Sequence, residues 1–246
     1  MSRTARLGLF LTAAAVLAAA LIAAATGLPA FGGSRHPYGD RAVSAGLAHR
    51  TANIVSSVNF DQRAFDTLGE ESILFGSVLG AGMLLRLARD ERKRRPAPGP
   101  VLPTTRLFGA TLLPVTVLTG GYIVAHGQLS PGGGFQGGVV LATALHLAYV
   151  AADYLVLKRI RPLAVLDVAD ALAAGAFAAL GLIGLAAGAG YLANTLPLGT
   201  FDQLSSGGLV PVLNAVVGVE VGSGVVVLLA HFLDQAVEVA PGGRGR

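Results

Sequence analysis

Four ionisable side chains inside long apolar stretches of this sequence are candidates for chemistry, because charged groups are rare and energetically unfavourable there. They are Glu70, Glu220, His146 and Asp153. A carboxyl or imidazole group can take up and release a proton, and an ionised carboxylate also attracts cations. Ionisable residues in such stretches are therefore candidates for a proton or cation pathway.

Glu220 lies between Gly218 and Gly222, whose four-residue spacing allows two helices to approach closely. A contact of that kind would remove the carboxyl group from water, and the group could then carry a proton. Alternatively, Glu220 pairs with a basic group or with the backbone of a neighbouring helix and never titrates. His231 follows eleven residues later and projects within about 20° of the same helix face.

His146 and Asp153 are seven residues apart, so on a helix they share one face to within about 20°, with Tyr149 between them. This polar stripe is a second candidate for proton handling. Two simpler roles stay open. His146 would form a hydrogen bond between helices, and Asp153, like His231, would reach water at the membrane interface.

Glu70 is followed by Glu71, and two local roles are open for the pair. Thr67 and Glu70 have the spacing of a capping box, in which each side chain satisfies a free backbone N–H group at the start of a helix. The adjacent carboxylates, at the mouth of a membrane helix, could instead gather cations or protons. Asp167 and Asp170 are expected to open another helix, where carboxylates complement the positive helix N-terminus.

A glycine-rich segment separates two of the apolar stretches. Glycine permits positive φ and close backbone approach, and proline ends a preceding helix. The segment therefore predicts an irregular joint at a membrane surface, with one bulky anchor, Phe135. The joint consists of Pro131, Gly132, Gly133, Gly134, Phe135, Gly137 and Gly138 within residues 131–138.

The chain that carries these residues has the composition of a membrane protein, with a mean hydropathy of +0.64. Hydrophobic residues make up 53% of its 246 residues and charged residues only 13%. Six apolar stretches each reach the roughly 17–25 residues that a helix needs to cross a bilayer. We therefore expect an all-α integral membrane protein with about six transmembrane helices. The stretches are 7–28, 68–87, 107–125, 135–157, 165–192 and 209–233.

Lys and Arg are scarce in short loops that cross the membrane, so their distribution predicts orientation. With the N-terminus and the C-terminus both in the cytoplasm, 14 of the 18 Lys and Arg residues lie on the cytoplasmic side. The first stretch exceeds the roughly 7–15-residue apolar core of a signal peptide, and we expect it to be retained as a helix.

A run of charged residues followed by several prolines divides the chain. We expect a two-helix N-terminal block at 1–95, a cytoplasmic linker at 96–103, a four-helix block at 104–235 and a cytoplasmic tail at 236–246. Helices should pack through glycines with four-residue spacing. The pairs are Gly76/Gly80, Gly184/Gly188 and Gly218/Gly222.

Several kinds of chemistry lack a signature in this sequence. The absence of cysteine excludes disulfides, thiolate zinc sites and cysteine-ligated iron–sulfur clusters. Phosphate-binding loops, nucleophile elbows and metalloprotease helices are also missing. We therefore expect a non-enzymatic chain with no cofactor and no metal site. The positive charge is explained by topology, so we expect no nucleic-acid partner.

The joint belongs to a longer motif with a specific resemblance. Residues 122–138, YIVAHGQLSPGGGFQGG, resemble the hallmark of the MnhB/MrpB family, whose members are subunits of Mrp-type multisubunit cation/proton antiporters. The resemblance continues through 191–194, 206–208, Asn214 and 217–221, and covers about residues 104–235. Gln128 stands where the family often has histidine, which argues against a proton or metal role for the joint.

The N-terminal block resembles another part of the same assembly. Residues 53–70, with the core FDTLGE, look like the two-helix segment at the C-terminal end of the MrpA-type antiporter subunit, which is a separate MbhE-like subunit in membrane-bound hydrogenases. Gln62 replaces a usual aromatic residue there, and Ala64 a usual glycine. Two neighbouring subunits would then be fused in one chain.

These resemblances imply a multi-pass membrane subunit of a monovalent cation (Na⁺)/proton antiporter in the inner (cytoplasmic) membrane of a prokaryote. The implied partners are large proton-channel subunits, small membrane subunits, the lipid bilayer, Na⁺ and H⁺. Glu70 and Glu220 are the residues carried over as ion candidates. A structural scaffold is one alternative. The ion-translocating module of a membrane-bound hydrogenase or of a complex I-related respiratory complex is another.

Overall fold

The computed structural model describes residues 3–28, 32, 36–85, 91–93, 101–152, 163–233 and 237–239. The chain divides into two compact units, Met1–Asp40 and Arg41–Arg246. The first unit holds α1 (Arg3–Thr26), an apolar helix of 24 residues without a buried side chain. Helix α2 (Pro37–Ala48) follows it along the chain.

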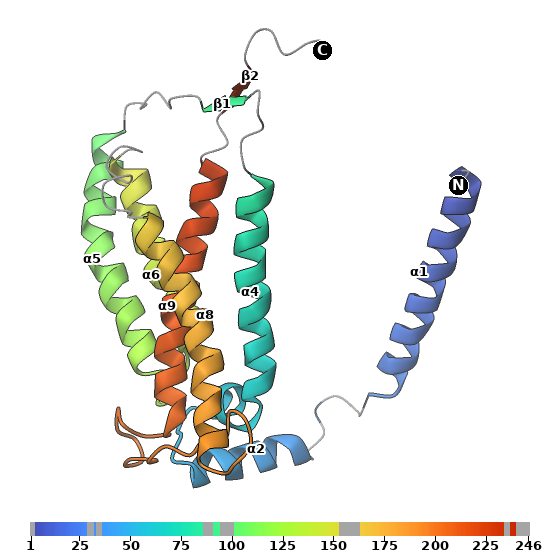
Figure 1. The fold of residues 1–246 in the computed structure, drawn as a ribbon, viewed down its shortest axis with the longest axis vertical. Helices are drawn as coiled ribbons and strands as arrows, with labels where there is room; N and C mark the ends of the chain where they lie inside the picture. Colours follow the sequence, from blue (N-terminus) through green and yellow to red (C-terminus); the bar gives the residue numbers. More distant parts are fainter. Residues whose placement is uncertain are drawn as a thin grey trace. The chain divides into compact units, whose positions relative to one another are not determined.

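The second unit is a bundle of long helices joined by short elements (Figure 1). Its long helices are α4 (Ala64–Leu84), α5 (Pro103–Ala125), α6 (Gly134–Ala152), α8 (Leu163–Ala186) and α9 (Leu209–Leu233). Before α4 come the short helix α3 (Ile54–Ser57) and the π-helical turn η1 (Val58–Gln62). The strands β1 (Glu91–Lys93) and β2 (Val237–Val239) pair antiparallel, with Glu91 opposite Val239.

The all-α membrane fold predicted from composition is confirmed. Five helices of the described chain, namely α1, α5, α6, α8 and α9, are long and apolar enough to cross a membrane. Helix α4 has 21 residues but carries Glu70 and Glu71, and it is not among the five.

The predicted bounds of α9 match the structure. Helix α8 ends at Ala186 rather than at residue 192, because Gly188 has a φ of 77° and the chain leaves the helix there.

Helix α9 is the central helix of the bundle, because it contacts α4, α5, α6 and α8. Leu213, Val217 and Val221 of α9 are at most 2% exposed and form the core together with Phe60 and Phe177. Helices in lipid gain no hydrophobic free energy from one another, so their association depends on close packing of small residues. The glycines next to α9 supply that packing.

The Gly218/Gly222 pair makes the close helix contact that its spacing predicts. A Cβ atom added to Gly218 would lie 2.8 Å from a methyl carbon of Val124 in α5. Gly138 of α6 packs still more tightly, since an added Cβ would lie 2.8 Å from Val221 and 3.0 Å from the carbonyl oxygen of Gly218. These glycines allow α5 and α6 to pack directly on the backbone of α9.

The other two glycine pairs do not pack helices within the described chain. The prediction was wrong for Gly184/Gly188, and it stays a prediction for Gly76/Gly80, whose side of α4 no described residue covers. An added Cβ on Gly184 would meet the carbonyl oxygen of Gly190, in the loop that follows α8. Gly188 ends that helix and has open space around it. Gly76 and Gly80 have no atom of the described chain within 4 Å of an added Cβ. Spacing alone did not reveal which face of α4 the bundle covers.

The glycine-rich joint is shorter than predicted. Gly132 and Gly133 have φ values of 134° and 123°, which only glycine adopts without strain, and α6 begins at Gly134. Phe135 packs against the core. The later glycines of the segment, including Gly137, lie in the first turns of α6 and serve close packing, since an added Cβ on Gly137 would meet Val124 at 2.4 Å.

Two asparagines tie the segment before α4 to the joint and to the residues just before it. Asn53 donates hydrogen bonds from its Nδ2 to the carbonyl oxygens of Gly127 and Ser130, both at 2.8 Å. Asn214 of α9 accepts a hydrogen bond from the backbone N–H of Gly134 at 2.8 Å and donates one to Ser56 Oγ at 2.8 Å. Parts of both predicted blocks are therefore held together at one end of the bundle.

Replacing Asn214 by Leu is expected to lower the free energy of unfolding by about 1–3 kcal/mol, because it leaves the buried Gly134 N–H and the Ser56 hydroxyl without this partner. Thermal unfolding of the purified protein in detergent measures the effect. Gln203→Leu is the control, because Gln203 is exposed and its loss should change stability by less than about 0.5 kcal/mol. Equal melting temperatures for the two variants would contradict the role given to Asn214.

Candidate functional site

Three carboxyl groups from three helices are buried together inside the bundle. Glu71 of α4, Asp170 of α8 and Glu220 of α9 are 1%, 3% and 0% exposed. We refer to these three residues as the carboxyl cluster. Glu220 was a candidate from sequence. Glu71 was considered only together with Glu70, as a pair that gathers cations or protons at a helix mouth, and Asp170 was expected to open its helix.

The carboxyl groups of the cluster interact electrostatically with one another. The carboxyl groups of Glu71 and Glu220 lie close enough to interact, and a hydrogen bond between them would require that one of them carries a proton. Asp170 is close enough to Glu220 for the two charged forms to repel each other. Its Oδ1 atom lies against α9 at Gly224, where an added Cβ would be only 2.9 Å away. Gly224 therefore leaves room for the Asp170 carboxyl group.

No hydrogen-bond donor of the described chain satisfies the cluster. Both carboxyl oxygens of Glu71, both of Glu220 and Oδ1 of Asp170 are buried without a hydrogen-bond partner among the described residues. An ionised carboxylate in such a place is strongly unfavourable unless it is paired, and repulsion within the cluster adds to this. The cluster must therefore hold protons, or draw a cation or donor from outside the described chain.

The cluster lies deep in the bundle. Glu220 follows the first residue of α9 by eleven positions, which places it about 17 Å along a helix of 25 residues. Because α9 is long enough to cross a membrane, Glu220 lies near the middle of a membrane-spanning helix. Glu71 and Asp170 meet it there from α4 and α8.

Glu220 is buried for a reason that differs from the predicted one. Two positions along a helix differ by about 200°, so Gly218 faces α5 while Glu220 points to the opposite side, toward Glu71 of α4. His231 also faces α4, since its Nε2 lies 2.9 Å from an added Cβ on Gly82. Glu220 and His231 therefore share a face, as their spacing predicts.

Glu70 is exposed on α4, whereas its neighbour Glu71 belongs to the cluster. The predicted capping box was wrong. Helix α4 begins before Thr67 and has Arg63 at its N-cap position, so Thr67 lies within the helix and is buried. An ion pair between Arg63 and Asp66 spans the first turn instead. One residue step turns a helix by about 100°, which is why adjacent glutamates face different surroundings.

The helix-start role predicted for Asp167 and Asp170 was also wrong. Helix α8 begins at Leu163 and has no acidic residue in its first turn. Asp167 is exposed, and Asp170 is buried on the face that also carries Ala173 and Phe177. That i, i+3, i+7 pattern was present in the sequence and could have identified Asp170 as a core-facing carboxyl.

The sequence of this bundle matches a known family. A family model described as "Domain related to MnhB subunit of Na+/H+ antiporter" matches residues 104–227, which is half of the chain. The chain belongs to the MnhB family. The resemblance based on residues 122–138 is thereby confirmed.

Relatives of this MnhB-family chain include an uncharacterized protein and a chain of a solved membrane complex. It is 29% identical over 201 residues to the uncharacterized protein MJ1307 of Methanocaldococcus jannaschii, covering 70% of this chain and 73% of that protein. It is 28% identical to a chain of the membrane-bound sulfane sulfur reductase, described as an archaeal respiratory membrane complex. That match has a TM-score of 0.71 and covers 95% of this chain and 99% of the other.

A second solved structure is the Mrp complex from Dietzia sp. DQ12-45-1b. The match has a TM-score of 0.67 and 23% identity, and at this identity the likeness concerns the fold. It covers all of this MnhB-family chain but only 27% of the Dietzia chain.

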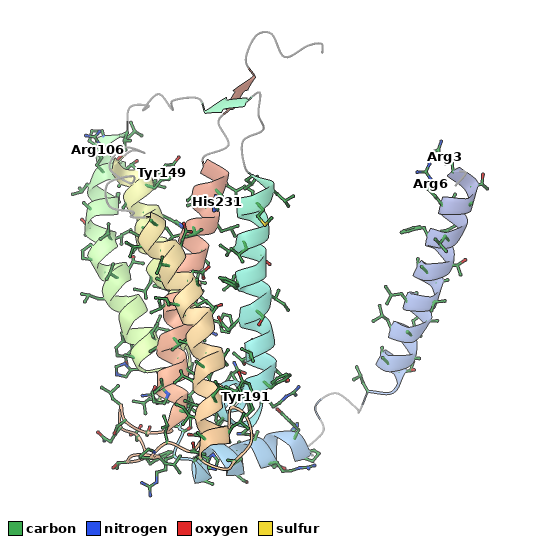
Figure 2. The ribbon with its side chains drawn as sticks, in the orientation of Figure 1. Arg3, Arg6, Arg106, Tyr149, Tyr191 and His231 are labelled. Carbon is green, nitrogen blue, oxygen red and sulfur yellow. The ribbon has the colours of Figure 1, made fainter. Side chains whose placement is uncertain are left out.

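The second polar stripe of this MnhB-family chain is only partly described. His146 is half-buried on α6, and its Nε2 has no hydrogen-bond partner among the described residues. Asp153 lies outside the described residues, so the stripe stays a prediction. Tyr149 lies toward the same end of the bundle as His231 (Figure 2).

The cluster is not arranged as a ready-made metal site. Within the described ranges, no group of three or more His, Asp or Glu side chains has the geometry to hold a metal ion. The facing carboxyl groups of Glu71 and Glu220 can instead share a proton. Proton binding and release is therefore the chemistry that this MnhB-family chain supports most directly.

Gly224→Ala is expected to lower the free energy of unfolding by up to about 1 kcal/mol relative to Gly175→Ala, because the new Cβ would displace the end of the Asp170 side chain. When Asp170 is first replaced by Ala, the same Gly224→Ala change should lower the free energy of unfolding by less, since the clash is gone. Thermal unfolding in detergent measures all three. Gly175→Ala in α8 is the control, because no atom lies within 4 Å of an added Cβ there. Additive losses in the double variant would contradict the contact.

Proposed function

We propose that this chain is a membrane subunit of an Mrp-type multisubunit monovalent cation (Na⁺)/proton antiporter and that its carboxyl cluster carries protons on the pathway. In this proposal, Glu71 and Glu220 share a proton, and Asp170 holds a second one or gives up its own when a cation arrives. The chain itself catalyses no covalent reaction.

The observation that carries the proposal is the burial of three carboxyl groups without a donor or cation from the described chain. Ionisable groups in a membrane-spanning bundle are rare and mark proton relays or ion pathways by default. A purely structural carboxyl group would be expected to have hydrogen-bond partners, because unsatisfied polar groups destabilise the fold. Five oxygens of the cluster lack such a partner among the described residues.

Membership of the MnhB family supports the assignment to an antiporter complex. The proposed partners are large proton-channel subunits, small membrane subunits and lipid, with Na⁺ and H⁺ as the ions moved. The likeness to a chain of the Dietzia Mrp complex, which is longer than this one, supports an assembly of that architecture. We also propose that residues 1–95 correspond to the MbhE-like part of the assembly.

We further propose a location in the inner membrane of a prokaryote, with the basic segments in the cytoplasm. Helix α4 ends, α5 begins and α9 ends at one end of the bundle (Figure 1). Most Lys and Arg residues of the second unit belong to the segments next to these helix ends. Such an asymmetry favours the cytoplasmic side.

A second candidate function has one observation in its favour. The match to a chain of the membrane-bound sulfane sulfur reductase covers 99% of that chain, so the same module occurs in a respiratory membrane complex. This chain would then couple a redox reaction carried out by other subunits to ion movement. Iron–sulfur or other redox subunits that co-purify with it would favour this candidate over a freestanding antiporter.

Replacing Glu71 or Glu220 by Gln in the intact complex is expected to reduce sodium-dependent proton movement at least about tenfold, because the amide cannot release a proton. Membrane vesicles with a pH-sensitive dye measure the movement, and immunoblotting measures the amount of complex. The amount should stay normal, since Gln has nearly the same shape as Glu.

Asp167→Asn is the matched control, because Asp167 lies on the same helix as Asp170 but is exposed. It should leave transport unchanged. Normal transport in both glutamine variants, with a normal amount of complex, would show that the cluster has no direct role and would leave the chain as a scaffold.

A further inference from the structure

Helix α4 has a face that nothing in the described bundle covers. Gly69, Ile73, Gly76 and Gly80 project within about 60° of one another on the helix. An added Cβ at any of the three glycines would meet no atom within 4 Å, and Ile73 is 71% exposed. We refer to these four residues as the outer face of α4.

The opposite side of the same helix makes the contacts within this chain. Thr67, Glu71 and Val78 are buried there, at 2%, 1% and 3% exposure. Their side is about 180° from the outer face on a helix. Helix α4 is thus held by α8 and α9 on one side only.

Glu70 is exposed between the outer face and the buried side of α4, about 60° from Ile73 around the helix. It has no ion pair or hydrogen bond with another described residue. It directly precedes Glu71, which meets Glu220 near the middle of α9, so Glu70 lies at membrane depth rather than at the interface. A carboxylate in contact with lipid at that depth is strongly unfavourable.

We propose that the outer face of α4 binds a transmembrane helix of another subunit and that this helix presents a basic side chain to Glu70. The proposal relies on the assembly put forward above, but not on any ion transport by the carboxyl cluster. Glycines along the outer face allow the backbone of the second helix to come close, which is how helices associate in lipid. The unpaired charge of Glu70 determines what that helix must carry, because a Lys, Arg or His side chain compensates it.

The partner can be identified by photo-cross-linking in the intact complex. A photoreactive amino acid replaces Ile73 on the outer face, and Leu74 serves as the matched control because it packs against the core of this chain. We expect position 73 to cross-link to a membrane segment of another subunit that has a basic residue at the depth of Glu70. Position 74 should give adducts only within this chain. Adducts with lipid alone at position 73, or with a segment that lacks a basic residue, would overturn the proposal.

Charge reversal tests the pairing separately from transport. Glu70→Lys should reduce the amount of the cross-linked subunit that co-purifies with this chain at least about tenfold, because two like charges would then meet away from water. An opposite change of the basic residue in the cross-linked subunit should restore co-purification. Folding of the chain itself is checked by its melting temperature, which Glu70→Lys should not change because the side chain is exposed. Undiminished co-purification of the Glu70→Lys chain would overturn the pairing.

Discussion

A carboxyl group is stable away from water only if it is protonated or is paired with a cation or with hydrogen-bond donors. Three carboxyl groups between α4, α8 and α9 are subject to this constraint. Glu71, Asp170 and Glu220 are almost fully buried, and five of their oxygens have no partner in the described chain. A soluble protein of this size would more easily replace such groups by apolar ones. The presence of these groups near the middle of a membrane-spanning bundle is the basis of the proposed link to ion movement.

The rest of the bundle holds these groups in place through close contacts of small residues. Gly138 and Gly218 let α6 and α5 pack against the backbone of α9, on the side away from Glu220. Gly224 makes room for Asp170. At one end, Asn214 joins α9 to the glycine joint and to the segment that leads into α4. The position of Glu71 opposite Glu220 therefore depends on contacts between distant parts of the sequence.

Much of this architecture could be predicted from the sequence, because a bilayer restricts the chain to long apolar helices. The bounds of α9 and the burial of Glu220 were predicted correctly. Asp170 was missed as a buried carboxyl group, because that role depends on where α8 begins, and Glu71 was considered only beside Glu70 at a helix mouth. The direction in which Gly76 and Gly80 face could not be predicted either, since spacing does not say which neighbour covers a helix.

The central claim is that the buried carboxyl groups exchange protons when a cation passes. Infrared difference spectroscopy of the intact complex, recorded on addition of sodium, tests it most directly. The account predicts that a band of protonated carboxyl groups decreases while a carboxylate band appears, and that Glu220→Gln removes this change. Carboxyl bands that do not respond to sodium, or that respond equally in the Glu220→Gln variant, would contradict it.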